Sequence, residues 1–169
     1  MIRIGQGFDA HRFCDGRDLK LGGIKIEHPR GLEGHSDADV LLHAVADALL
    51  GAMGADDLGT HFPPGEEHTR NIDSQEMILY TLRLLSKHRF KVVNIDATLI
   101  CQEPKIKPYS ARIRENIARL CSVQSTEVSL KGKTTEGMGF TGRREGIAAI
   151  VVVLIEGIEG VNEPRTGIG

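Results

Sequence analysis

The chain has no tryptophan, and aromatic residues make up only 4% of its 169 residues. Its core must therefore be aliphatic, which suits helices packed on a sheet. Positive charge is not in excess either, because the formal net charge is −2. General nucleic-acid binders usually carry a dense basic face, so that class is disfavoured. A phosphate ligand would have to be bound by a few local groups.

Cysteine is also scarce: Cys14, Cys101 and Cys121 are widely spaced and form no CxxC pair. This excludes a disulfide framework and a cysteine zinc site, and it favours a reducing compartment. The N-terminus lacks a basic segment followed by an apolar run, and no stretch reaches the length of a membrane span. We therefore expect a soluble, cytoplasmic protein.

The length fits one domain, which we assign to residues 1–156, with a mobile, glycine-rich C-terminal tail over residues 157–169. Neither repeats nor low-complexity blocks interrupt it. Residue patterns predict a hairpin over 19–26 and strands over 1–7, 90–101, 127–131 and 147–155. They predict helices over 38–53, 74–87 and 110–120, with Ser36 and Asp39 as the cap of the first and Asp73 and Glu76 as the cap of the second.

This irregular alternation of strands and helices indicates an α+β fold: a two-layer sandwich in which helices cover one face of a mixed β-sheet. The last predicted strand, 147–155, is apolar at every position, so both of its faces should be buried. One layer of helices covers only one face of a sheet. We therefore expect the sheets of several copies to pack together in an oligomer.

A candidate metal site begins with Asp9 and His11 in the stretch GQGFDAH. Side chains two residues apart on a strand point the same way, so this acid and this histidine can meet at one point. A short DxH pattern is also typical of a surface pair at the end of an edge strand. Asp39, His43 and Asp47 form a polar stripe on the first predicted helix, which has no Lys, Glu or Arg from Ala38 to Met53.

We predict that His43 completes a three-ligand set with Asp9 and His11. Asp39 and Asp47 would support the ligands from the same helix, with Asp47 holding the free ring nitrogen of His43. Two histidines and one carboxylate with an open fourth position suit catalytic zinc, and the same set suits manganese or ferrous iron.

Three further segments could contact an anion. The stretch 131–144, KGKTTEGMGFTGRR, combines glycines, hydroxyls and cations that suit phosphate oxygens, and Glu136 could hold a second, harder metal. An ordinary turn-rich connection has a similar composition. The connection 54–73 is either a substrate-closing flap or a disordered insertion. The stretch 102–108, QEPKIKP, is a proline-stiffened turn with two lysines.

Together these motifs resemble the 2-C-methyl-D-erythritol 2,4-cyclodiphosphate synthase family. The resemblance runs in order through GQGFDAH, HSDADVLLHAVADALLGA, DLGTHFP, QEPKIKP and TTEGMGFTGRREGIAA, up to about residue 156. It implies a homotrimer with active sites between subunits, zinc on Asp9, His11 and His43, and magnesium or manganese on Glu136. The implied reaction cyclises 4-diphosphocytidyl-2-C-methyl-D-erythritol 2-phosphate and releases CMP, in the non-mevalonate route to isoprenoid precursors.

The resemblance also implies roles for single residues. His35, Ser36 and Thr134 would lie around the phosphates, with His35 and Thr134 stabilising the transition state. Substrate contacts to the methylerythritol end would come from Asp57, Gly59 and Phe62. Contacts to the cytidine diphosphate, from the neighbouring subunit, would come from Cys101, Lys105, Ile106, Gly132 and Lys133. Phe140 and Arg143 would line a cavity on the trimer axis that can take a prenyl diphosphate.

Two other functions fit the same residues. A metal-dependent phosphohydrolase would use metal-bound water in place of the internal phosphate. A non-catalytic nucleotide-binding or metal-sensing module would use the metal structurally, but structural zinc usually has four protein ligands, and the sequence offers three at convincing positions.

Overall fold

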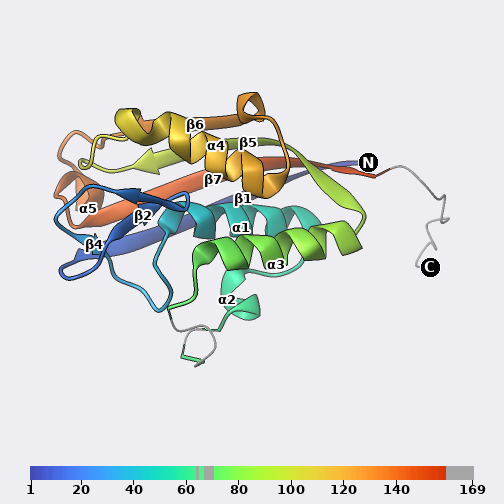
Figure 1. Ribbon diagram of the computed structural model, residues 1–169, viewed down its shortest axis with the longest axis horizontal. Helices are drawn as coiled ribbons and strands as arrows, with labels where there is room; N and C mark the ends of the chain where they lie inside the picture. Colours follow the sequence, from blue (N-terminus) through green and yellow to red (C-terminus); the bar gives the residue numbers. More distant parts are fainter. Residues whose placement is uncertain (64, 67–70, 159–169) are drawn as a thin grey trace.

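The computed structural model describes residues 1–63, 65–66 and 71–158 (Figure 1). Within them, five strands form one mixed sheet. Their spatial order is β4 (Gly31–Leu32), β1 (Ile2–Cys14), β7 (Gly146–Gly157), β5 (Phe90–Ile100) and β6 (Val128–Lys133). β7 runs antiparallel to β1 and to β5, whereas β5 and β6 are parallel. The predicted hairpin is a separate pair, β2 (Leu19–Leu21) and β3 (Ile24–Ile26).

Three longer helices cover one face of this sheet: α1 (Val40–Met53), α3 (Ser74–Lys87) and α4 (Ser110–Cys121). α1 packs on β1 and β7, α4 on β6, and α3 beside α1 (Figure 1). The shorter elements are α2 (Leu58–His61), α5 (Gly139–Gly142), and the 3₁₀ turns η2 (Lys107–Tyr109) and η3 (Ser125–Glu127). The predicted α+β fold with a mixed sheet is confirmed.

Two local predictions need correction. The first strand does not end near Gly7 but continues to Cys14, because its backbone pairs with β7 as far as Arg12. The cap of α1 is Asp39, not Ser36: the Asp39 carboxylate accepts the N–H of Leu42, as an N-cap side chain does. The predicted helix 74–87 has the observed bounds of α3, and α4 extends one residue past the predicted end.

The helix-covered face of the sheet holds the core. On β7, Val151, Val153 and Ile155 are buried beneath the helices. The opposite face is apolar but lies open in the single chain, where Val152 is 40% exposed and Ile4 on β1 is 69% exposed. The expectation that both faces of the last strand are buried is therefore not met within one chain, because the protein's own helices reach only one face.

The three cysteines are free thiols: Cys101 and Cys121 are buried, and Cys14 is half-buried at the end of β1. In the part of the chain that the structure describes, no helix is long and apolar enough to cross a membrane. Of the predicted tail 157–169, Gly157 ends β7 and residues 159–169 lie outside the described residues.

Candidate functional site

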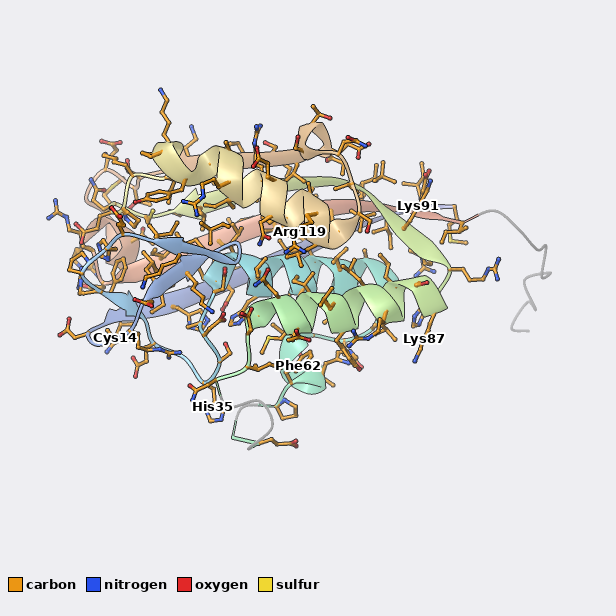
Figure 2. All side chains as sticks on the ribbon, in the orientation of Figure 1. Cys14, His35, Phe62, Lys87, Lys91 and Arg119 are labelled. Atoms are coloured by element: carbon orange, nitrogen blue, oxygen red, sulfur yellow. The ribbon has the colours of Figure 1, made fainter. Side chains whose placement is uncertain are left out.

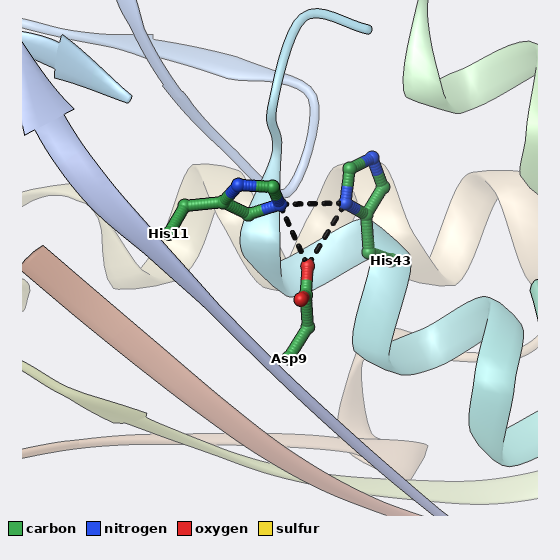
Figure 3. Close-up of side chains that lie close together, drawn as sticks. All are labelled: Asp9, His11 and His43. Carbon is green, nitrogen blue, oxygen red and sulfur yellow. Dashed lines mark hydrogen bonds and ion pairs between the residues drawn. The ribbon is translucent and has the colours of Figure 1, made fainter. Parts of the chain in front are cut away.

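Asp9, His11 and His43 converge on one point between β1 and α1 (Figure 3). Asp9 Oδ2 lies 2.9 Å from His11 Nε2 and 2.9 Å from His43 Nδ1. The two ring nitrogens lie 3.1 Å apart. One carboxylate oxygen and two imidazole nitrogens thus face a common centre, as predicted from the spacing.

Close packing of α1 on β1 brings the three side chains together. A Cβ atom at Gly7 would lie 2.0 Å from the carbonyl oxygen of Ala44, and one at Gly5 would lie 1.9 Å from that of Ala48. Only glycine lets the helix backbone approach the strand this closely. His43, which precedes Ala44, therefore sits directly over Asp9, two residues beyond Gly7.

Hydrogen bonds to the other ring nitrogen assign the tautomer of His11. Its Nδ1 lies 2.7 Å from the carbonyl oxygen of Glu33. A carbonyl only accepts, so Nδ1 carries the hydrogen and Nε2 turns its lone pair to the shared centre.

The tautomer of His43 follows from a chain of contacts behind the ring. Its Nε2 lies 3.0 Å from the hydroxyl of Ser74 and 3.1 Å from that of Ser36. The Ser74 hydroxyl donates to the carboxylate of Asp37, so its oxygen is left to accept from His43 Nε2–H. Nδ1 then is the nitrogen left to face a metal, so each histidine can offer one ring nitrogen to the shared centre.

Charge is also arranged for a cation. Burial by itself raises the pKa of Asp9, but the contacts with the rings of His11 and His43 outweigh it and hold that pKa well below its ordinary value. Burial lowers the pKa of His11, and the Asp9 carboxylate reverses this and raises it. The carboxylate is thus ionised at neutral pH. An ionised carboxylate with two nitrogen donors fits a zinc-type ion with a position left open.

The predicted supporting role of Asp47 is wrong in detail. Its carboxylate accepts the backbone N–H of Leu58 at 2.7 Å, and the free ring nitrogen of His43 is held by Ser36 and Ser74 instead. Asp39 is fully buried away from the centre, where it accepts the N–H groups of Gly22, Gly23 and Leu42 and ties the β2–β3 hairpin to α1. Both acids hold backbone in place.

A cavity of about 330 Å³ opens beside the three ligands. Of the predicted substrate residues, His35, Ser36, Gly59 and Phe62 line it, and Asp57 does not. His35 and Phe62 lie at the same edge of the molecule (Figure 2). The cavity is completed by Asp47, Leu58 and Met77.

Part of the predicted flap 54–73 is an ordered segment on α3. Asp57 caps α2 by accepting from the N–H and hydroxyl of Thr60. His61 Nδ1 lies 3.2 Å from the hydroxyl of Tyr80, and the ring of Phe62 packs edge-on against Tyr80 with centroids 5.2 Å apart. α2 is therefore held against α3. Residues 64 and 67–70 lie outside the described residues.

A second cavity, also about 330 Å³, lies at the ends of β5 and β6. The predicted nucleotide contacts all line it, together with Thr134: Cys101, Lys105, Ile106, Gly132 and Lys133. Burial raises the pKa of the Cys101 thiol to about 11, so the thiol is protonated at neutral pH, and it points to the carbonyl of Pro104. None of the residues described as lining this cavity lines the first one.

The remaining predicted residues, Glu136, Phe140 and Arg143, come shortly after Thr134 of the second cavity in the sequence. The Thr134 hydroxyl donates to Glu136 Oε1 at 2.7 Å, which places that carboxylate beside the cavity. Arg143 pairs with Glu145 at 2.7 Å, and Phe140 is an exposed residue of α5.

Ser74, which contacts His43 at the metal centre, is the residue that the sequence did not predict. Its signal was weak, because it stands far from His43 in the sequence and reads as the first residue of a helix.

The family model for the YgbB family matches residues 2–156. A curated relative from Geobacillus thermodenitrificans is 51% identical over 156 residues, which cover 92% of this chain and 98% of the relative. Another, from Caldicellulosiruptor bescii, is 50% identical over 155 residues, covering 92% of this chain and 99% of the relative. Both are named 2-C-methyl-D-erythritol 2,4-cyclodiphosphate synthase.

Solved structures agree with the sequence matches. A complex of IspF from Plasmodium falciparum with CDP superposes with a TM-score of 0.82 at 34% identity, covering 94% of this chain and 97% of that one. The bifunctional IspDF from Campylobacter jejuni gives a TM-score of 0.90 at 35% identity, covering 94% of this chain but 43% of the longer protein. A synthase structure described as a CDP-bound form gives 0.84 at 33% identity, covering 91% of this chain and 100% of that one.

Proposed function

The chain belongs to the YgbB family, and from this membership we propose that it forms 2-C-methyl-D-erythritol 2,4-cyclodiphosphate, the reaction named for its curated relatives. It is an enzyme of isoprenoid precursor biosynthesis. The observation that carries the proposal is the match over nearly the whole length of both proteins, joined to a three-ligand centre beside a cavity.

The substrate is 4-diphosphocytidyl-2-C-methyl-D-erythritol 2-phosphate. An oxygen of its 2-phosphate forms a bond to the β-phosphorus, the bond from that phosphorus to the bridging oxygen breaks, and CMP leaves with that oxygen. The attacking group belongs to the substrate, so no protein nucleophile is needed, and the enzyme is a phosphorus–oxygen lyase. Phosphoryl transfer of this kind depends on positioning and charge stabilisation.

Asp9, His11 and His43 would hold zinc, and Glu136 would hold magnesium or manganese. When bound, these cations supply Lewis acidity to the β-phosphate and neutralise charge on the α- and β-phosphate oxygens. The residues of the chain fit this use: the zinc ligands combine one ionised carboxylate with two imidazole nitrogens, and Glu136 is exposed beside Thr134.

The protein's own polar groups would orient the substrate. Thr134 lines the second cavity with Lys105 and Lys133, whose ammonium groups suit the diphosphate. His35 and Ser36 line the first cavity beside the ligands. Asp57, Gly59 and Phe62 lie at or near α2, where the methylerythritol end would bind.

We further propose that the active enzyme is a homotrimer that works in the cytoplasm, with each active site built from two subunits. Two observations support shared sites. The metal-ligand cavity and the nucleotide cavity have no lining residue in common, so one chain offers two half-sites. The open face of the sheet carries exposed Ile4, Phe8 and Val152, which a neighbouring copy would cover. Phe140 and Arg143 would then lie near the trimer axis and could take a prenyl diphosphate.

Product analysis tests the proposed reaction. The purified, zinc- and magnesium-loaded enzyme is incubated with the cytidine-linked substrate, and its products are followed by phosphorus NMR. We expect the cyclic diphosphate and CMP in equal amounts. Open-chain methylerythritol 2,4-bisphosphate together with CMP would instead identify a phosphohydrolase, and CDP binding without any product would identify a nucleotide-binding module. A chelator-treated sample of the same preparation is the control.

A further inference from the structure

The wall of the nucleotide cavity contains one residue that turns away from it. Cys101, Gln102, Pro104, Lys105 and Ile106 all line the cavity, whereas Glu103, in the middle of this run, does not. Its carboxylate lies among basic side chains of two other segments of the chain. Glu103, which does not line the cavity, thus connects the loop 101–106 to these other segments.

Three basic side chains surround this carboxylate, and we call the four residues the Glu103 cluster. Glu103 Oε1 accepts from Arg30 Nη2 at 3.1 Å and lies 3.4 Å from His28 Nε2. Glu103 Oε2 lies 3.5 Å from Arg144 Nε. The hydrogen bond from Arg30, the charge of Arg144 and the contact with His28 outweigh the effect of burial and lower the pKa of Glu103, so its carboxylate is ionised at neutral pH.

The basic side of the cluster is anchored on the sheet. The ring of Phe13 on β1 stacks on His28 with centroids 5.0 Å apart, and the Arg30 guanidinium lies 4.5 Å from the Phe13 ring centroid. His28 Nδ1 lies 2.8 Å from the carbonyl of Arg30, which fixes the two residues to each other. Arg30 and His28 are therefore held by contacts that do not involve Glu103.

The cluster also joins a second segment to the cavity wall. Arg30 Nη2 donates to the carbonyl of Arg144 at 3.2 Å, while the side chain of Arg144 faces Glu103. Arg144 directly follows the segment that begins at Thr134 in the cavity and passes through Glu136 and α5. The Glu103 carboxylate thus connects two segments that contribute to the cavity wall, 101–106 and 134–144, to the residues that pack on Phe13 of β1.

An isolated exposed ion pair contributes little to the free energy of unfolding, because solvent screens the charges and two long side chains must be ordered. The Glu103 cluster differs in both respects. Its carboxylate meets two guanidinium groups and the His28 ring, and its nearest guanidinium also packs on the Phe13 ring. Removing the Glu103 charge therefore releases the loop without leaving a large buried defect.

We propose that Glu103 is a positioning residue of the nucleotide cavity. Its carboxylate holds the loop 101–106 in the geometry that receives a cytidine diphosphate, and Glu103 itself does not touch the ligand. The inference rests on the proposed function in one respect, since that function makes this cavity the nucleotide site. It predicts that loss of the Glu103 charge weakens nucleotide binding and leaves the metal centre intact.

The test compares Glu103→Gln with the wild type, each loaded with zinc. Calorimetry with CDP as the probe should give a Kd for the variant about tenfold above that of the wild type. A change of this size is usual when one of two contacting residues is altered. Steady-state kinetics should show a similar rise in KM with kcat within about twofold, because the chemistry at the metal centre is untouched. Zinc content should equal that of the wild type. Loss of a merely structural contact would lower the amount of folded enzyme and leave KM unchanged.

The matched control is Glu156→Gln, which removes the same charge from an ion pair with Lys91 at 3.0 Å, where β5 begins and β7 ends. It should bind CDP as the wild type does. A second test variant, Arg144→Ala, removes only the Oε2 contact and should raise the Kd less than Glu103→Gln does. This exposed substitution keeps the test valid if Glu103→Gln fails to fold.

Two results would overturn the inference. If the wild type binds CDP and the folded variants of Glu103 and Arg144 match it in Kd and KM, the cluster does not position the loop and the proposed function still stands. If the wild type itself does not bind CDP, the proposed function fails and the inference fails with it.

Discussion

The hydroxyl of Ser74, the first residue of α3, lies 3.0 Å from Nε2 of His43 on α1. Because Ser74 also donates to Asp37, its oxygen can only accept from that ring nitrogen. α3 thus fixes which nitrogen of His43 is free to bind a metal. A helix that covers the core also takes part in preparing the ligand set.

Ser74→Ala should therefore weaken zinc binding by about tenfold, as is typical when the partner of a metal-bound histidine is lost. The remaining Ser36 contact keeps part of the ring's support, so zinc is retained at high concentration. Competition with a zinc chelator measures the effect. Thr81→Val removes another buried hydroxyl of α3, one that donates to its own helix, and serves as the control. Equal chelator curves for Ser74→Ala and the wild type would remove the assigned role.

His43→Ala should lose its zinc and release no CMP, because only Asp9 and His11 remain as ligands. The fold and the oligomer should persist, since α1 is held by Val40, Leu41 and other apolar side chains that the change does not touch. Elemental analysis, a CMP assay and light scattering check the three expectations. Normal turnover by this variant would refute the ligand assignment.

Glu136→Gln should show a large fall in rate and a weaker response to added magnesium. An amide oxygen is a poorer ligand for this hard cation than a carboxylate. The Gln side chain can still accept the Thr134 hydroxyl, so the loop should keep its shape. Rate measurements across a magnesium titration test the assignment, and a titration curve like that of the wild type would contradict it.

Gly7→Ala should destabilise the protein and displace α1, because its Cβ would lie 2.0 Å from the carbonyl oxygen of Ala44. Overpacking of this kind costs about 1–3 kcal/mol or more in the free energy of unfolding. Zinc affinity should fall too, since the movement separates His43 from Asp9.

The matched control is Gly51→Ala on α1, the helix that packs on Gly7, because a Cβ at Gly51 would meet its nearest atom at an ordinary 3.7 Å. Alanine favours the helix over glycine, so this change should stabilise the fold by up to about 1 kcal/mol. Thermal unfolding compares the two variants. Equal melting temperatures for Gly7→Ala and the wild type would show that α1 does not depend on this close approach.

The features that short-range periodicity encodes could be predicted from the sequence. Alternation along a strand placed Asp9 and His11 together, and the apolar helix pattern singled out His43 as their partner. The bounds of α3 followed from Asp73 as a cap and the apolar spacing after it. Each of these features depends on residues a few positions apart.

The errors came from interactions between distant segments. The length of β1 depends on its pairing with β7 from the other end of the chain, which no local pattern reports. Asp47 stands one helical turn from His43, but its carboxylate is taken by the N–H of Leu58 in the next segment. Ser74 reaches His43 only because α3 packs beside α1.

The burial of two of the three cysteines offers a use at the bench. Burial raises the pKa of the Cys101 thiol to about 11 and that of Cys121 to about 12, so at neutral pH neither forms the thiolate that attacks a maleimide. Cys14 is half-buried at the end of β1. A fluorescent maleimide at neutral pH should therefore label the natural protein at Cys14 alone, giving a single dye on the strand that carries Asp9 and His11 without any engineered cysteine.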